Sequence, residues 1–277
     1  MNHIDIPKKK QTELAKKASF DDIPDFAFNP KDDWVEVFQK GLKQIDFNDK
    51  CIYEVGVGIG TNLFFLLDNF HPHSIYFSDI DARLTHRAYK NLSFTHSEKL
   101  PICKPIHGDI DLIETKLSDN ENHSLDYIIA CIPQVFNDKI DKQPPDFNAH
   151  FYRKHSLKKS PYHKLGLDLN YSLLKLAKKK SPKAEVILNL NCRFGVTPLL
   201  QLFIDSGYMP NLLYQARVKQ CMTTGLDFFV EAEKQGLNCE FYNNPHARTP
   251  ISAHEAEKSI KYGPIYHSVA VIRGKPN

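Results

Sequence analysis

The chain has 277 residues, of which 42% are hydrophobic and 25% are charged, and its formal net charge is +3. This composition is ordinary for a folded globular protein and excludes a collagen-like, low-complexity or largely disordered chain. The basic residues occur in short scattered runs, such as 8–10 and 178–180, which argues against a nucleic-acid partner, and no apolar run approaches the roughly 20 residues that span a bilayer.

The cysteines and the N-terminal residues bear on the compartment. Six cysteines are spread along the chain without a C-x-x-C pair, so we expect reduced thiols and neither a disulfide framework nor a metal site. No apolar secretory segment precedes the lysine-rich residues 7–11, which predicts a cytoplasmic protein without a membrane partner. Nothing in the sequence indicates an oligomeric state.

Residues 1–47 are polar and lack strand patterns, although apolar residues including Trp34, Phe38 and Leu42 recur there at helical spacing. We therefore expect an N-terminal helical extension or lid over residues 1–47, followed by one domain over 48–277.

An apolar strand predicted over 51–55 leads directly into Gly56, Gly58 and Gly60 and then into an apolar helix over 61–70. Glycines on alternate positions let the chain turn sharply and bring backbone N–H groups close to a ligand. The spacing differs from the dinucleotide pattern G-x-G-x-x-G, and the acid Glu54 lies two residues before the first glycine. Glu-x-Gly-x-Gly-x-Gly after a strand resembles the first motif of class I methyltransferases that use S-adenosylmethionine (SAM), a ligand with a cationic sulfonium and an amino group.

Two further strands are expected to end in acids at the same edge. The segment 74–78 ends at Asp79, with Ile80 beside it, and a carboxylate at this place can accept hydrogen bonds from both ribose hydroxyls. Asp81 is expected to cap a helix that begins at Ala82. After a strand over 102–106, the resemblance implies that Asp109, with Ile110 next to it, receives the adenine amino group.

The remaining pattern alternates strands with helices: a strand over 125–131, a helix over 164–179, a strand over 184–190 and a helix over 196–206. Extended segments follow over 211–220 and 265–273, with a surface insertion at about 236–263 between them. We predict an α/β fold with a Rossmann-like, mostly parallel sheet, helices on both faces and a C-terminal antiparallel hairpin.

The loop after the fourth strand is the most distinctive segment. Ligands of open α/β sheets lie beyond the carboxyl ends of the strands, so Cys131 is predicted to contact the cofactor and Ile132, Pro133 and Gln134 the transferred group. Amine and amide methyltransferases carry Asn/Asp-Pro-Pro-Tyr/Phe here. This chain lacks the first polar residue and the second proline, so nitrogen methylation loses support.

Cys131-Ile-Pro-Gln-Val-Phe-Asn137 resembles the methyltransferase module of methionine S-methyltransferase, as do 33–42, 166–169, 189–195, 247–249 and 265–271 in the same order. The resemblance implies a small amino-acid-like acceptor, with a thioether sulfur as one possibility. It is specific at the Ile-Pro-Gln loop and loose elsewhere, and the segment 139–162 differs.

Further candidate acceptor residues are aromatic or basic. Tyr152, Tyr162 and Tyr171 lie in a region that commonly covers the acceptor, and Arg193, after the fifth predicted strand, could pair with a substrate carboxylate. Packing tyrosines and a surface ion pair for Arg193 remain alternatives.

Two other functions stay open at this point. A site that excludes an external acceptor could let the amino group of SAM attack its own chain and close a ring, as azetidine-2-carboxylate synthases do, releasing methylthioadenosine. A non-catalytic SAM-binding protein is the third possibility.

Overall fold

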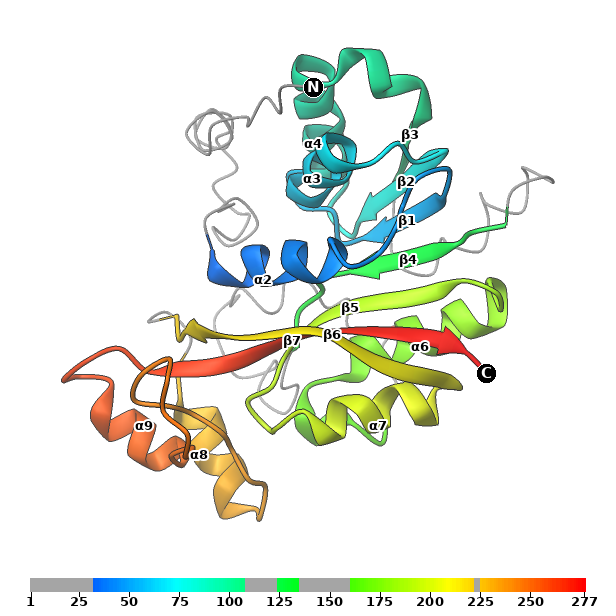
Figure 1. The fold of residues 1–277 in the computed structure, drawn as a ribbon. Helices are drawn as coiled ribbons and strands as arrows, with labels where there is room; N and C mark the ends of the chain where they lie inside the picture. Colours follow the sequence, from blue (N-terminus) through cyan, green and yellow to red (C-terminus); the bar gives the residue numbers. More distant parts are fainter. Residues whose placement is uncertain (1–31, 108–123, 135–159, 222–224) are drawn as a thin grey trace.

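The structure is a computed structural model that describes residues 32–107, 124–134, 160–221 and 225–277 (Figure 1). Within these ranges, seven strands form one sheet in the order β3-β2-β1-β4-β5-β7-β6. The strands are β1 (Cys51–Val55), β2 (Ser74–Asp79), β3 (Cys103–His107), β4 (Tyr127–Ala130), β5 (Glu185–Asn191), β6 (Tyr208–Lys219) and β7 (Tyr266–Pro276). The first five are parallel, and β7 runs antiparallel to both β5 and β6. The predicted Rossmann-like, mostly parallel sheet with a C-terminal antiparallel hairpin is confirmed.

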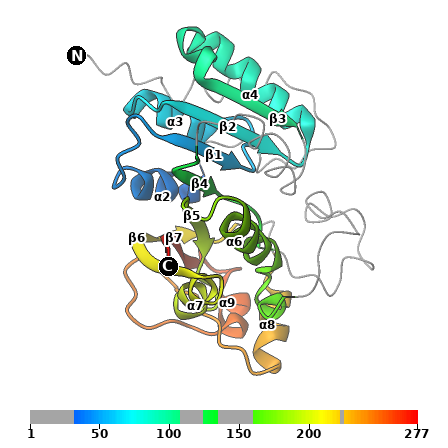
Figure 2. The same cartoon turned by 90° about the vertical axis from the view of Figure 1, so that its right-hand side faces the viewer.

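Helices cover both faces of this sheet. The helices α2 (Asp33–Leu42), α3 (Thr61–Asn69) and α4 (Ala82–Thr95) pack on one face, and α6 (Asp168–Lys180) and α7 (Thr197–Asp205) pack on the other. In Figure 2, α2 and α6 lie on opposite sides of β4 and β5. Two short 3-10 segments, η2 (Ser97–Ile102) and η6 (His163–Leu165), complete the layers.

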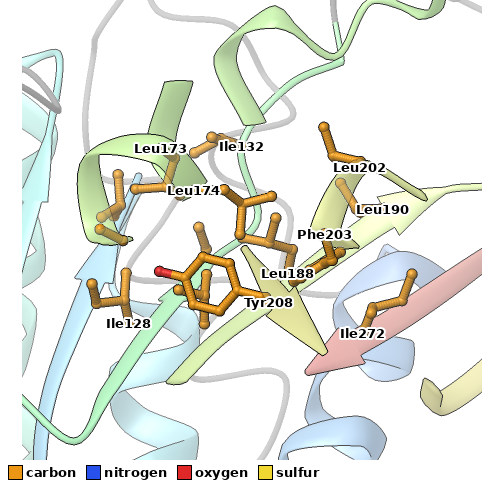
Figure 3. Close-up of a cluster of buried hydrophobic side chains, with 14 of the residues drawn as sticks. Ile128, Ile132, Leu173, Leu174, Leu188, Leu190, Leu202, Phe203, Tyr208 and Ile272 are labelled. Atoms are coloured by element: carbon orange, nitrogen blue, oxygen red, sulfur yellow. The ribbon is translucent and has the colours of Figure 1, made fainter. Parts of the chain in front are cut away.

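The central strands β1 and β2 are buried along their length because helices cover both of their faces. All five residues of β1 and all six of β2 are buried, which is the pattern of a parallel sheet between two helical layers. Figure 3 shows the cluster on the α6 and α7 face, where Ile132 lies next to Leu173. The loop after β4 is thereby anchored in the core at its second residue.

The predicted helix over 164–179 is wrong at its N-terminal end. Gly166 has φ +68°, a left-handed conformation that separates η6 from α6. The buried carboxylate of Asp168 accepts from the backbone N–H of Ser160 at 2.8 Å and contacts the ring of His163 at 2.5 Å. These contacts favour the break, so α6 begins at Asp168.

The insertion between β6 and β7 also differs from its prediction, because it contains α8 (Asp227–Lys234), which precedes residue 236, and α9 (Ala253–Ser259). The two helices lie beside the ends of β6 and β7 and have a small core of their own (Figure 1). We call residues 225–263 the cap.

The helix α2 contributes to the main core through the fully buried side chains of Phe38 and Leu42. The division into an extension over 1–47 and a domain over 48–277 stays a prediction. Among the described residues, no helix is long and apolar enough to cross a membrane.

Candidate functional site

The glycine-rich turn lies at the carboxyl end of β1. Gly56, Gly58 and Gly60 all have positive φ, at +76°, +54° and +93°. The backbone N–H groups of Gly56 and Val57 both donate to the carbonyl of Ser78, at 2.9 Å each, which fixes the turn to the end of β2. A side chain at Gly56 would lie 3.0 Å from Ile132 as well as being strained, so the turn requires glycine there.

Glu54 is buried directly beneath this turn, with 1% of its surface exposed. Its Oε1 accepts from the side chain of Asn62 at 2.8 Å, whereas its Oε2 and the Oδ1 of Asn62 are buried and have no hydrogen-bond partner among residues 32–107, 124–134, 160–221 and 225–277. The pKa of Glu54 is raised to about 8, mainly by burial. The hydrogen bond from Asn62 lowers this pKa, and the charge of Asp79 contributes to raising it. Two unsatisfied buried acceptors beside two acids fit a cationic donor such as an ammonium group.

Asp79 closes β2 and faces the same turn. Its carboxylate accepts from the backbone N–H of Gly58 at 3.0 Å and of Asp81 at 3.1 Å, so it bridges the turn and Asp81. The half-buried residue Ile80 lies between the two acids. Asp81 caps α4 as predicted, because its side chain accepts from the backbone N–H of Arg83 at 2.9 Å. The Asp79 carboxylate is therefore held at the carboxyl edge of the sheet, where the ribose role predicted for it stays a prediction.

The loop after β4 begins with Cys131 and Ile132. The thiol of Cys131 accepts from the side chain of Asn189 at 3.3 Å, and burial raises its pKa to about 12. Asn189 also donates to the backbone carbonyl of Trp34 at 3.0 Å, which links the start of α2 to the site. Ile132 is buried against the glycine turn, and Pro133 is half-buried beside it.

The amide of Gln134 is engaged with the end of β5. Its oxygen accepts from the backbone N–H and the side-chain amide of Asn191, both at 2.7 Å, and its nitrogen donates to the Asn191 carbonyl at 3.3 Å. Gln134 therefore joins the loop after β4 to the end of β5, and it is not simply a solvated side chain.

Of the three predicted tyrosines, Tyr162 and Tyr171 pack together with ring centroids 5.8 Å apart, and Tyr162 belongs to the same buried cluster as Ile132. The Tyr162 hydroxyl donates to Asp205 at 2.6 Å, and burial, followed by this carboxylate, raises its pKa. Its ring thus belongs to the core cluster that also contains Ile132, while its hydroxyl points to α7. Tyr152, Asp109 and Ile110 lie outside the described residues.

Arg193 follows β5 and is half-buried. Its Nε donates to the side-chain oxygen of Gln220 at 3.1 Å, and its guanidinium lies 5.3 Å from the ring centroid of Phe229 in α8. Burial lowers its pKa to about 10, so it remains charged at neutral pH. In the described part of the chain, Arg193 forms no ion pair, so the surface ion pair considered from the sequence is not found there.

Several polar residues at this edge were missed from the sequence, namely Asn62, Asn189, Asn191 and His267. A polar residue within an otherwise apolar helix or strand was the available signal, as for Asn189 and Asn191 in β5. His267 is 5% exposed in β7, where a histidine precedes a run of apolar residues. No group of histidine, cysteine and acid residues suited to a metal occurs within the described ranges.

No family model matches the chain. Among curated proteins it is similar to methionine S-methyltransferase of Hordeum vulgare, with 26% identity over 92% of this chain and 26% of that protein. It is also similar to the enzyme of the same name from Zea mays, with 26% identity over 92% of this chain and 25% of that protein. The enzyme of this name from Wollastonia biflora shows 27% identity over 78% of this chain and 21% of that protein.

The chain thus spans about a quarter of the length of the curated relatives it matches. The resemblance to the methyltransferase module of methionine S-methyltransferase, predicted from the sequence, is confirmed. Among solved structures, the YcgJ protein of Bacillus subtilis aligns with 86% of this chain and 98% of its own, with a TM-score of 0.47 and 10% identity. That likeness adds nothing to the sheet topology described above.

Proposed function

We propose that this chain is a SAM-dependent methyltransferase that acts on a small amino-acid-like acceptor, with a thioether sulfur such as that of methionine as the first candidate. The observation that carries the proposal is the buried, unsatisfied pair of acceptors on Glu54 and Asn62 beneath the glycine turn. The curated relatives support the reaction class, since all three are named for methyl transfer to methionine.

The residues present suit the cofactor. Glu54 and Asn62 would receive its amino group, and Asp79 would accept hydrogen bonds from its ribose. Gly56 and Gly58 allow close approach of the backbone. When bound, SAM supplies an activated methyl group on a positively charged sulfur, and the negative charge of Asp79, with that of Glu54 once it has lost its proton, favours a cation at this place.

The loop after β4 would then shape the reaction centre. Transfer of the methyl group is an in-line displacement that depends mainly on positioning, and a thioether has no proton to lose, so the chain needs no general base. Ile132 supplies an apolar wall that limits access of water. Because burial keeps the Cys131 thiol protonated, this side chain does not compete as a thiolate nucleophile for the methyl group.

The clamp between Gln134 and Asn191 would hold the acceptor side of the centre relative to the cofactor side. Because the chemistry is sensitive to alignment, a fixed distance between the ends of β4 and β5 favours turnover. Tyr162 and Tyr171 support the loop through the core, and an aromatic ring facing the sulfonium would add a cation–π attraction of about 1–2 kcal/mol.

The test is to incubate the purified full chain with SAM and a pool of amino acids and small thioethers, and to identify products by mass spectrometry. We expect S-adenosylhomocysteine together with a methylated acceptor, and loss of both products in Asp79→Ala. Release of methylthioadenosine without an acceptor would instead support the ring-closing reaction, for which the named relatives give no support. Calorimetric binding of SAM without any product would point to a non-catalytic binding protein.

A further inference from the structure

Three polar residues meet where β5 and β6 end and β7 begins: Arg193 follows β5, Gln220 follows β6, and His267 lies in β7. The ladder between β5 and β7 pairs Asn191 with Val269, and Cys192 N–H donates to the carbonyl of Ser268 at 2.8 Å. Continuing this register by two residues places Arg193 opposite His267. Directly opposed residues of antiparallel strands have Cβ atoms about 4.5–5.5 Å apart.

The strand β6 completes the group from the other side. His267 is paired with Val218 in the β6 and β7 ladder, and Gln220, two residues further on, donates its backbone N–H to Ile265 at 2.7 Å. Gln220 is 1% exposed, and its side-chain oxygen accepts a hydrogen bond from the Nε of Arg193. Gln220 therefore orients the guanidinium relative to His267.

Among the described residues, no carboxylate forms an ion pair with Arg193 that would balance its charge. The charges that act on its pKa belong to the thiols of Cys192, Cys221 and Cys239. Burial raises the pKa of Cys192 and of Cys239 to about 12, so both are neutral at pH 7. Glu240 donates its backbone N–H to the Arg193 carbonyl at 2.8 Å, but its carboxylate accepts from the hydroxyl of Tyr242 at 3.3 Å.

Donor groups are also left over. The guanidinium carries five N–H donors, of which only Nε is engaged among the described residues. His267 is only 5% exposed. Its Nδ1 atom is buried and has no hydrogen-bond partner among the described residues. Burial, and then the charge of Arg193, lowers the pKa of His267 well below its ordinary value, so its ring is neutral and carries one N–H donor.

The cap lies against this group. Phe229 of α8 lies beneath the guanidinium, and the cap segment at Tyr242 exchanges two backbone hydrogen bonds with Tyr266, both 2.8 Å, at the start of β7. Arg193 and His267 thus lie between the ends of the strands and the cap.

We infer that Arg193 and His267 form a receptor for the carboxylate of the acceptor, with Gln220 as a positioning residue. This inference rests on the proposed methyltransferase function and gives its acceptor class: an α-amino acid or another small carboxylic acid. One unbalanced positive charge matches one carboxylate, and the guanidinium fork matches its two oxygens.

The receptor lies at a suitable distance from the proposed reaction centre. The Oδ1 of Asn191 accepts from the Arg193 backbone N–H at 3.4 Å, and Asn191 is itself clamped to Gln134. Gln134 of the loop after β4 contacts Asn191, two residues before Arg193, which corresponds to about 6–7 Å along an extended strand. A small amino acid spans this distance, so its carboxylate can be held while its far end reaches the loop after β4.

The test compares L-methionine with L-methioninol, in which an alcohol replaces the carboxylate, as acceptors in the presence of SAM. For the unaltered chain we expect kcat/KM to be roughly 10- to 100-fold higher for methionine, the range of a hydrogen-bonded charged group. Arg193→Gln should remove most of this preference by lowering kcat/KM for methionine only, and His267→Phe should reduce it by a smaller factor. The dissociation constant of SAM should not change in either variant.

Arg217→Gln is the matched control, because Arg217 also stacks on an aromatic ring of the cap, 3.5 Å from the centroid of Tyr242, but its pairing with Ser268 places its side chain on the sheet face opposite to that of His267. It should keep the preference for methionine. If Arg193→Gln does not fold, Arg193→Lys can replace it, because lysine keeps the positive charge but lacks the two-pronged guanidinium. This variant should lower the ratio of kcat/KM for methionine to that for methioninol, but less than Arg193→Gln would.

Equal loss of activity on methionine and methioninol in Arg193→Gln would overturn the receptor, as would an unchanged preference. If the unaltered chain binds SAM but methylates neither compound, the proposed function fails separately. Calorimetric titration with L-methionine and with propionate then decides the receptor alone: binding abolished by Arg193→Gln supports it, and no binding to the unaltered chain refutes it.

Discussion

Replacement of Glu54 by glutamine tests the physical basis of the proposed cofactor site. Glu54 is buried, with one oxygen unsatisfied, and its pKa is raised to about 8 from an ordinary value of 4.5. Between pH 4.5 and about pH 8, Glu54 therefore keeps its proton in the folded state and has lost it in the unfolded state. Over this window the free energy of unfolding falls as the pH rises, because the native state holds more protons than the unfolded state.

The magnitude follows from the two pKa values. A rise in the pKa of Glu54 from 4.5 to about 8 on folding lowers the free energy of unfolding by at most about 5 kcal/mol above pH 8. About 3 kcal/mol of this loss develops between pH 5.5 and pH 8. Glu54→Gln removes the ionisation while keeping the shape of the side chain. We expect the variant to be more stable than the unaltered chain at pH 8, with an advantage that is about 3 kcal/mol smaller at pH 5.5 and disappears below about pH 4.

The same substitution should weaken SAM binding, because it removes the carboxylate that would receive the amino group. Loss of a hydrogen bond to a charged group amounts to about 1.5–3 kcal/mol, or roughly 10- to 150-fold in the dissociation constant. Since the ligand would favour ionised Glu54, binding to the unaltered chain should also release a proton at pH 7. Titration calorimetry in buffers of different ionisation enthalpy measures this release, which the variant should lack.

Glu36→Gln is the control, because Glu36 is an acid of α2 that is paired with Lys40 at 2.8 Å and is more than half exposed. It should change neither the pH dependence of urea unfolding nor the uptake of SAM. If Glu54→Gln left the stability profile between pH 5.5 and pH 8 unchanged and bound SAM as tightly as the unaltered chain, the reasoning about a buried, cation-seeking carboxylate would be refuted.

Three further substitutions separate the roles assigned above. Asp79→Ala should weaken SAM binding by about 1–3 kcal/mol in calorimetry through unpaired ribose hydroxyls, and unchanged affinity would remove Asp79 from the ribose site. Gln134→Ala breaks the clamp to Asn191 and should lower kcat while sparing SAM affinity; an equal loss in both would move Gln134 into the cofactor site. Gly41→Ala should destabilise the fold by about 1–3 kcal/mol in urea unfolding, because its Cβ would lie 2.5 Å from Val271 in the core, and a midpoint like that of the unaltered chain would contradict the close packing of α2 on β7.

The parts of the fold that could be predicted from the sequence depend on local patterns. Glu54, the alternating glycines and Asp79 occur at strand ends within about 25 residues, and buried strands are apolar along their length, so the sheet and its edge followed from neighbours in the chain. The cap helices were missed, since each has only seven or eight residues and packs on a core formed by distant segments.

Site contacts between distant residues were not predictable in this way. Gln134 and Asn191 are 57 residues apart, and the amide of Gln134 has the same sequence signal whether it binds β5 or solvent. Arg193 and His267 are brought together only by the antiparallel return of β7, whose register no local pattern specifies.

The turn after β1 has one further consequence. The backbone N–H groups of Gly56 and Val57 both bond to the Ser78 carbonyl, so the turn is already ordered in the folded protein. Its conformational entropy is therefore lost during folding and not when a ligand binds. A rigid receptor of this kind gives up little freedom on association, so a larger share of each new contact remains as affinity. The selectivity of this protein would then reside mainly in the groups that touch the incoming molecule, and variation in the acceptor could evolve at the cap without disturbing the adenosyl half.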